Sequence, residues 1–172
     1  LGTGAAGGNV LWMALASNGT LYAAGSFTSM GGVANTNNIA QWNGSAWSAL
    51  GTGVTGGSGI LTMAVDSANN LYVGGTFTTM GGVANTLRLA KWDGSVWSAL
   101  GTGANDVVRA LTVGVGDVLY IGGDFTTING TSAIRVASWN GSTASALSTG
   151  MDNSVRALAI GPNNILYAGG DM

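Results

Sequence analysis

The sequence predicts an all-β fold, and three observations support this prediction. Matching stretches begin at Leu1, Leu50, Leu100 and Leu147, so a related segment returns at spacings of 49, 50 and 47 residues. Each full return contains four short segments of β-type residues separated by turn signals. No segment shows the sustained 3.6-residue apolar period of a helix. Four antiparallel strands that recur at such an interval are typical of a β-propeller blade.

The repeat divides the 172 residues into three complete units and one partial unit. We expect the units at residues 1–49, 50–99 and 100–146, followed by residues 147–172 with only the first two strands. The chain is therefore predicted to be a single domain of about three and a half blades, belonging to a larger closed propeller. Aromatic residues recur at matching places: Tyr22, Tyr72, Tyr120 and Tyr167; Phe27, Phe77 and Phe125; Trp42, Trp92 and Trp139; Trp47 and Trp97.

Each strand of the unit has its own residue pattern. The first strand is apolar, as at Val108–Val113, and leads into a tight turn rich in Asn, Gly and Asp. The second strand begins Leu-Tyr and ends in paired glycines, as at Leu71–Gly75. The third strand, at residues 88–92 in the second unit, ends in a tryptophan. A predicted two-residue turn at Asp93-Gly94 then leads to the fourth strand.

The strand-ending double glycine, the following aromatic residue and the tryptophans resemble the kelch repeat. The pattern is most similar to the kelch-like repeats of large secreted or surface proteins, and the resemblance covers nearly the whole chain. It implies four-stranded propeller blades and no particular chemistry. The chain departs from the pattern where Ala24 replaces the first glycine and where Ala144 replaces a tryptophan. Both departures predict looser packing at those positions.

The first strands are expected to be buried on both faces, because both faces are apolar. One face carries large side chains, such as Leu111 and Val113, and the other carries small ones, such as Ala110 and Thr112. A large face that meets a small face allows neighbouring blades to pack closely. The glycines of the second strand leave room for a close neighbour, and we expect the aromatic rings to occupy that room.

A row of blades leaves apolar faces bare at its two ends, because one blade cannot bury its faces alone. We expect the missing blades to come from other parts of the same polypeptide or from neighbouring protein chains. Association of two copies is the less favoured arrangement, since it would combine two unfinished blades. The uncovered faces are expected to bear Met13, Leu15, Leu158 and Ile160, so the isolated segment should aggregate, or become ordered only against neighbouring chains or the rest of its own polypeptide. The start at Leu1 rather than at a methionine likewise suggests a fragment or a processed piece.

Candidate binding residues come from the face that carries the long loops, where function concentrates in rigid scaffolds. Asp106 precedes Arg109, and Asp152 precedes Arg156, at matching places before and within the first strands. The four residues form either a polar ligand site near the propeller axis or two local ion pairs. We favour the local ion pairs, because such pairs are common on protein surfaces.

Other polar and aromatic residues have a structural interpretation beside the functional one. Arg88 and Arg135 begin third strands and are expected to bind loop carbonyls. Asp66 suggests either a calcium loop or a turn, and its sequence context favours the turn. Trp47 and Trp97 are of the type that stacks on sugars, but their recurrence favours blade packing. The glycosylation sequons at Asn18, Asn43, Asn129 and Asn140 contain the Asn-Gly pairs that hairpins also require.

Composition narrows the classes of function. Charged residues make up 7% of the chain and the formal net charge is −2, which argues against nucleic acid as a partner. No apolar run reaches the roughly 20 residues that cross a bilayer, so we predict no membrane insertion. The chain has no His, Cys or Glu, which leaves Asp, Tyr and Lys91 as candidate bases. We therefore predict no enzymatic activity, no metal and no cofactor.

The function hypothesis follows from the repeat and the composition. We expect a structural, adhesion or recognition module of a larger extracellular, cell-surface or virion-surface protein. The alternative is a carbohydrate-binding or carbohydrate-active propeller, whose site would be completed by residues outside this segment. Glycans are the candidate ligands of that alternative.

Overall fold

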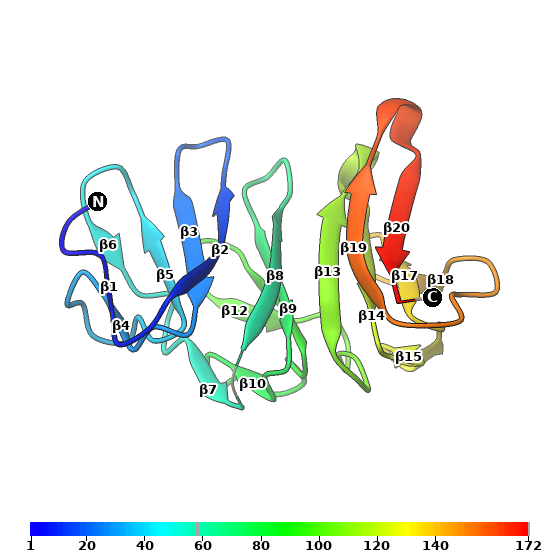
Figure 1. Ribbon diagram of the computed structural model, residues 1–172, viewed down its shortest axis with the longest axis horizontal. Helices are drawn as coiled ribbons and strands as arrows, with labels where there is room; N and C mark the ends of the chain where they lie inside the picture. The colour runs from blue at the N-terminus through cyan, green and yellow to red at the C-terminus, as the bar shows by residue number, and fades with distance from the viewer. Residues whose placement is uncertain (58, 172) are drawn as a thin grey trace.

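The computed structural model describes residues 1–57 and 59–171, and it is all-β. Three four-stranded antiparallel sheets and one two-stranded sheet follow one another along the chain, as Figure 1 shows. We call them blades 1 to 4. Blade 1 contains β2 (Val10–Leu15), β3 (Leu21–Gly25), β5 (Ile39–Trp42) and β6 (Trp47–Ser48). Blade 2 contains β8 (Ile60–Val65), β9 (Leu71–Gly75), β11 (Leu89–Trp92) and β12 (Trp97–Ala99).

The second half of the chain repeats this arrangement. Blade 3 contains β13 (Val108–Val113), β14 (Leu119–Gly123), β17 (Val136–Trp139) and β18 (Ala144–Ala146). Blade 4 consists of β19 (Val155–Ile160) and β20 (Leu166–Gly170). The propeller-blade architecture predicted from the repeat is confirmed, and the described sheets do not close into a ring. None of the described residues belongs to a helix long and apolar enough to cross a membrane.

Small two-stranded sheets order the loops at one end of the blades. The connector before each of the first two blades pairs with the loop between that blade's second and third strands, through β1 (Ala5–Ala6) with β4 (Ser29–Met30) and β7 (Val54–Gly56) with β10 (Thr79–Met80). In blade 3 the loop folds on itself, through β15 (Thr127–Ile128) and β16 (Thr131–Ser132). The long loops are therefore pinned to the blades (Figure 1, bottom).

The third-to-fourth strand turns lie one residue later than the sequence suggested. In blade 1, Asn43 N–H donates to the carbonyl of Ala46, so the two central residues are Gly44 and Ser45. Gly44 has a φ of 99°, whereas the Asn43 side chain accepts hydrogen bonds from the amides of Ser45 and Ala46. The pair Asn-Gly thus supplies a side-chain acceptor followed by a residue that tolerates positive φ. Asp93 and Asn140 accept the same bonds in blades 2 and 3.

Neighbouring blades contact each other through their first and second strands. Met63 and Val65, the large side chains of β8, pack against the buried cluster that holds Tyr22 and Ala24 of blade 1. Leu111 and Val113 of β13 pack in the same way against Tyr72 of blade 2. The large face of each first strand therefore points to the preceding blade, and the small face points to the following one.

The first glycine of each second-strand pair receives a side chain of the next blade. A Cβ on Gly122 would lie 2.5 Å from Val155 Cγ1, and a Cβ on Gly74 would collide with Val108. The expectation that aromatic rings occupy this space is wrong, because a branched aliphatic side chain of the next first strand is there. In blade 1 the position holds Ala24, which is fully buried in one cluster with Ile60, so the predicted looser packing is not found.

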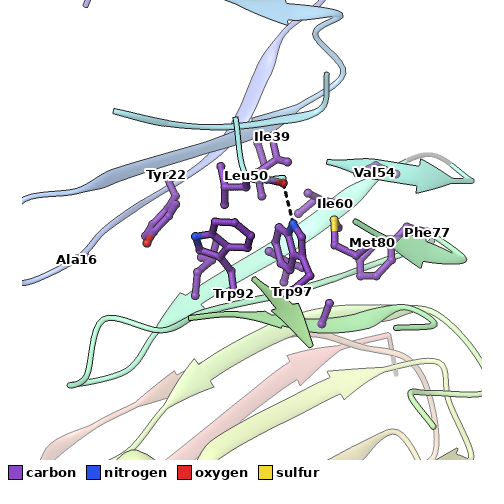
Figure 2. Close-up of a cluster of buried hydrophobic side chains, with 14 residues drawn as sticks. Ala16, Tyr22, Ile39, Leu50, Val54, Ile60, Phe77, Met80, Trp92 and Trp97 are labelled. Atoms are coloured by element: carbon purple, nitrogen blue, oxygen red, sulfur yellow. Dashed lines mark hydrogen bonds between the residues drawn. The ribbon is translucent and has the colours of Figure 1, made fainter. Parts of the chain in front are cut away.

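The fourth-strand tryptophans join each blade to the start of its own repeat. Trp97 Nε1 donates a 2.8 Å hydrogen bond to the carbonyl of Leu50, as Figure 2 shows, and Trp47 Nε1 donates one to Leu1. Both rings are buried, and each packs against the tryptophan of the neighbouring third strand, with centroids 5.2 Å apart for Trp92 and Trp97. Trp47 and Trp97 therefore serve blade packing, as their recurrence predicted.

Blade 3 has Ala144 in place of this tryptophan, and another side chain makes the hydrogen bond to the start of the repeat; the looser packing at Ala144 stays a prediction. In blades 1 and 2 a glycine faces the indole, and a Cβ on Gly31 would lie 2.9 Å from Trp47 Cδ1. Blade 3 has Asn129 at this position, opposite Ala144. The Asn129 amide oxygen accepts a 3.1 Å hydrogen bond from Thr102 N, so it binds the start of the repeat in place of an indole. Blades 1 and 2 therefore combine a fourth-strand tryptophan with a loop glycine, whereas blade 3 combines a fourth-strand alanine with a loop asparagine. Each combination makes a hydrogen bond to the start of the repeat.

The two ends of the row expose different faces. At the first end no preceding blade covers the large face of β2, and Met13 is 66% exposed whereas its equivalent Leu111 is 7% exposed. At the other end Leu158 and Ile160 are half-buried against blade 3, so the expectation that they are uncovered is wrong. The uncovered side of blade 4 is the small face with Tyr167, which is 56% exposed. Each end thus lacks a different neighbour.

The exchange seen in blade 3 predicts coupling between Trp97 and Gly81. Trp97→Ala should cost about 3 kcal/mol, because it removes a buried ring and its hydrogen bond. Gly81→Asn should also destabilise the chain, since its Cβ would collide with the Trp97 ring. The double variant should be more stable than the sum of the single effects predicts by at least about 1 kcal/mol. Chemical denaturation measures all four proteins, and strict additivity would contradict the exchange.

Candidate functional site

A row of charged and polar side chains lies where the first strands of blades 3 and 4 begin. Every first strand has a bulge at its second residue, which is Arg109 in β13 and Arg156 in β19. Bulges re-aim side chains, and both guanidinium groups reach the aspartate that follows the second strand of their own blade. Arg109 binds Asp124 with a shortest distance of 2.6 Å, and Arg156 binds Asp171 at 2.7 Å.

Ser154 joins these two ion pairs across the blade boundary. The Ser154 hydroxyl donates a hydrogen bond to the Asp124 carboxylate. Ser154 is buried and directly precedes β19. The hydrogen bonds from Arg109, followed by the one from Ser154, hold the pKa of Asp124 below its ordinary value. The pKa of Asp171 is lowered chiefly by its hydrogen bonds from Arg156. Asp124 is therefore a charged acceptor shared by two blades, and Asp171 has no following blade in the structure.

The structure separates the residues that the sequence grouped together. Arg109 and Arg156 do form ion pairs within their blades, but the partners are Asp124 and Asp171. Asp106 is exposed, and its carboxylate accepts a hydrogen bond from the amide of Val107. The pairing of Asp106 with Arg109, and of Asp152 with Arg156, is therefore wrong within the described residues. Asp152 is exposed at the open side of blade 4.

The sequence contained a signal for the true partners. Units three and four carry an arginine at the bulge and an aspartate directly after the double glycine. Units one and two have leucine at the first place, Leu11 and Leu61, and a hydroxyl residue at the second, Ser26 and Thr76. The two positions therefore change together between units. Comparing residue pairs across units, instead of residues close in sequence, identifies the ion pairs.

The remaining arginines bind backbone, as the sequence predicted. Arg88 Nη1 donates a 3.1 Å hydrogen bond to the carbonyl of Ala104, and Arg135 Nη1 donates one to Met151. Each bond links a loop of one blade to the connector that leads into the next blade. In blade 1 the amide of Asn37 reaches the carbonyl of Val54 in the same way. These contacts fasten the blades on the long-loop face.

The opposite face has its own blade-to-blade hydrogen bonds. Side chains of the first-to-second strand turns accept bonds from the preceding blade's turn: Asn69 from Ser17 and Asn18, Asp117 from Ser67, and Asn164 from Val115. Asp66 lies in one of these turns and accepts hydrogen bonds from the amides of Ala68 and Asn70, so it has the turn role favoured over a calcium ligand. No cluster of three metal-ligating side chains occurs among residues 1–57 and 59–171.

Two hollows accompany these contacts. The first has a volume of about 480 Å³ and lies at blade 4, where residues 151–155 and 168–171 line it. The second, of about 340 Å³, lies on the tight-turn face between blades 1 and 2. Its lining is mostly polar and includes Asn18, Gln41, Asn43, Asn69 and Asp93. The chain thus offers a small polar hollow on the face opposite the long loops.

Comparisons with known proteins add no identification. No family model matches the chain, and no curated protein matches its sequence. The kelch-like resemblance therefore stays a prediction from the repeat, and function must be argued from the residues.

The shared carboxylate of Asp124 should contribute to stability in a pH-dependent way. Its folded-state pKa is depressed, so the stabilisation is present above the unfolded value of about 3.9 and is lost as the pH falls through the folded-state pKa. Asp124→Asn should cost about 1 kcal/mol at neutral pH and flatten the acid dependence of unfolding. Denaturation from neutral pH down to about pH 2 measures both effects, because the stabilisation is lost below the unfolded value of about 3.9.

Asp106→Asn is the matched control for this experiment, because within residues 1–57 and 59–171 the Asp106 carboxylate accepts a hydrogen bond only from the amide of Val107. It should unfold like the wild type at every pH. An acid profile that Asp106→Asn changes and Asp124→Asn leaves intact would contradict the assignment of the ion pair.

Proposed function

We propose that the chain is a non-enzymatic structural, adhesion or recognition module within a larger extracellular, cell-surface or virion-surface protein. The single observation that carries this proposal is that its cationic side chains already have structural partners. Arg109 and Arg156 bind aspartates, and Arg88 and Arg135 bind backbone carbonyls. The fifth cation, Lys91, lies 5.8 Å from the centre of the Tyr72 ring. These groups hold blades and loops in place.

The carboxylates support the same proposal. Six of the seven aspartates accept hydrogen bonds within the described residues, and most of these bonds close turns or link blades. Hydrolytic and acid–base chemistry needs a pair of facing groups with freedom to exchange protons. Among the hydroxyl groups, that of Tyr72 is the best candidate for acid–base chemistry. Its pKa is raised far above its ordinary value, mainly by burial and then by the nearby Asp66 carboxylate. It is better suited to donating a fixed hydrogen bond than to acting as a base.

The surface composition favours a location outside the cell in this proposal. With 7% charged residues, the exposed loops rely on Gly, Thr, Ser and Asn for their polarity. The loops on the long-loop face are tied down by small sheets and inter-blade hydrogen bonds. A rigid array of loops is a suitable scaffold for recognising another surface, because little conformational entropy is lost on binding.

A carbohydrate-binding role is the second candidate, and the polar hollow between blades 1 and 2 favours it. Amide and carboxylate groups converge there, among them Gln41, Asn43 and Asp93, beside Tyr22. Sugar hydroxyls need such paired donors and acceptors. This hollow lies on the tight-turn face and not on the long-loop face, which the sequence had favoured for binding.

A glycan array probed with the full chain distinguishes the two candidates. The structural and adhesion proposal predicts no glycan signal that depends on Gln41. The carbohydrate proposal predicts binding that Gln41→Ala weakens by at least about tenfold, as expected for a lost hydrogen bond in a polar site. Ser138→Ala is the matched control, because Ser138 has the equivalent strand position in blade 3, outside the hollow. Binding lost with Gln41→Ala and kept with Ser138→Ala would overturn the first proposal in favour of the second.

A further inference from the structure

The two open ends of the blade row carry complementary surfaces. We define the N-terminal end face by Val10, Met13 and Leu15 of β2, which are 39%, 66% and 70% exposed. We define the C-terminal end face by Ala157, Ala159, Tyr167 and Gly169 of blade 4, all of them exposed. Four of the large apolar side chains that the described residues expose lie on these two faces, namely Val10, Met13, Leu15 and Tyr167. Apolar surface gathered in this way marks an interaction site.

Each internal boundary shows what such faces bind. Val155 fills the space above Gly122, and Leu158 Cδ1 would lie 3.3 Å from a Cβ on that glycine. The equivalent glycine of blade 4 is Gly169, where an added Cβ would meet nothing within 4 Å. The hollow of about 480 Å³ lies beside it. The space beside Gly169 is therefore open, whereas a branched side chain of the next blade fills the same space beside Gly122.

The N-terminal end face has the residues that fit this site. Val10 corresponds to Val155, Met13 to Leu158 and Leu15 to Ile160 in the repeat. Asn9 corresponds to Ser154, the residue whose hydroxyl binds Asp124. An Asn9 amide would meet Asp171 in the same place, because Asp171 follows β20 as Asp124 follows β14.

The hydrogen bonds of the turns match as well. At the internal boundaries a turn side chain, such as Asn164, accepts a bond from the preceding turn. Val115 N is the donor there, and the equivalent residue of blade 4 is Pro162, which has no N–H. The equivalent of the acceptor Asn164 in blade 1 is Gly19, which has no side chain. In a contact between blade 4 of one chain and blade 1 of another, Pro162 would supply no N–H donor and Gly19 no side-chain acceptor. This turn hydrogen bond would therefore be absent without leaving an unsatisfied partner.

The two-stranded state of blade 4 does not prevent this contact. Blades 3 and 4 already pack through the first and second strands alone, β13 and β14 against β19. Blade 4 makes this contact with two strands, so a blade can bind its neighbour through its first and second strands. This removes the physical objection to association between copies, which rested on their unfinished blades.

We propose that the C-terminal end face of one chain binds the N-terminal end face of a second copy, head to tail, in the geometry of an internal blade boundary. Such a contact is heterologous, so it closes when the rotation allows a ring and otherwise propagates. The inference does not use the adhesion role, and a change of mass can be observed whether or not that role holds.

Complementation between two blocked variants tests the proposal by sedimentation velocity. Gly169→Val fills the empty glycine contact, and Met13→Asp places a charge in the opposite face. The wild type should sediment as an assembly larger than the monomer, and each variant alone should be monomeric. An equimolar mixture of the two should return species of twice the monomer mass, because each variant keeps one intact face. Ala159→Asp is a second block of the C-terminal end face and should behave like Gly169→Val.

The controls separate a lost contact from a lost fold. Val96→Asp alters an exposed apolar residue in a blade 2 turn and should leave the assembly intact. Thermal melting should show that Gly169→Val stays folded, whereas Gly122→Val, the same change at a covered site, should lower the melting temperature. A monomeric wild type would overturn the proposal. So would blocked variants that still associate alone, or folded variants that fail to combine in the mixture.

Discussion

The structure depends on the contact between the large face of one first strand and the small face of the preceding blade. In blades 2 and 3 the first glycine of the second-strand pair makes this contact close, because it admits a valine of the next blade where a side chain would collide, as at Gly122 with Val155. Every blade contributes one large face and one small face, so the same contact can repeat without limit. The polar bonds on both faces of the row, from Arg88 on one side and Asp117 on the other, fix the angle and the register between blades. A row built in this way has two unlike ends by necessity.

This contact also explains where the charged residues lie. In blades 1 and 2 the bulge position holds leucine, whereas in blades 3 and 4 it holds an arginine paired with an aspartate from the second-strand end. Asp124 is bound from both sides, by Arg109 within its blade and by Ser154 across the boundary. At the start of the first strands of blades 3 and 4, these charged and polar contacts therefore lie beside the apolar contact between the blades. Few charged residues are left over for ligand chemistry.

The sequence predicted the fold well because the repeat shows the same element several times. The first strands Val108–Val113 and Val155–Ile160 lie where the apolar pattern placed them. The partners of Arg109 and Arg156 were wrong, because proximity in sequence does not indicate which residues meet across a hairpin. Asn129 in place of a glycine was also missed, since its reason is the absence of a tryptophan on another strand. Errors of this kind arise wherever a side chain depends on tertiary contacts, which only comparison between units reveals.

Hydrogen exchange of the first strands tests the central claim most directly. In the monomer, prepared with both Met13→Asp and Gly169→Val, β2, β8, β13 and β19 all form hairpins with similar backbone pairing. If contact between blades holds the structure together, amides of β8 and β13, covered on both faces, should exchange far more slowly than those of β2 and β19. Equal protection in all four strands would show that each blade is stable by itself, and would contradict the account.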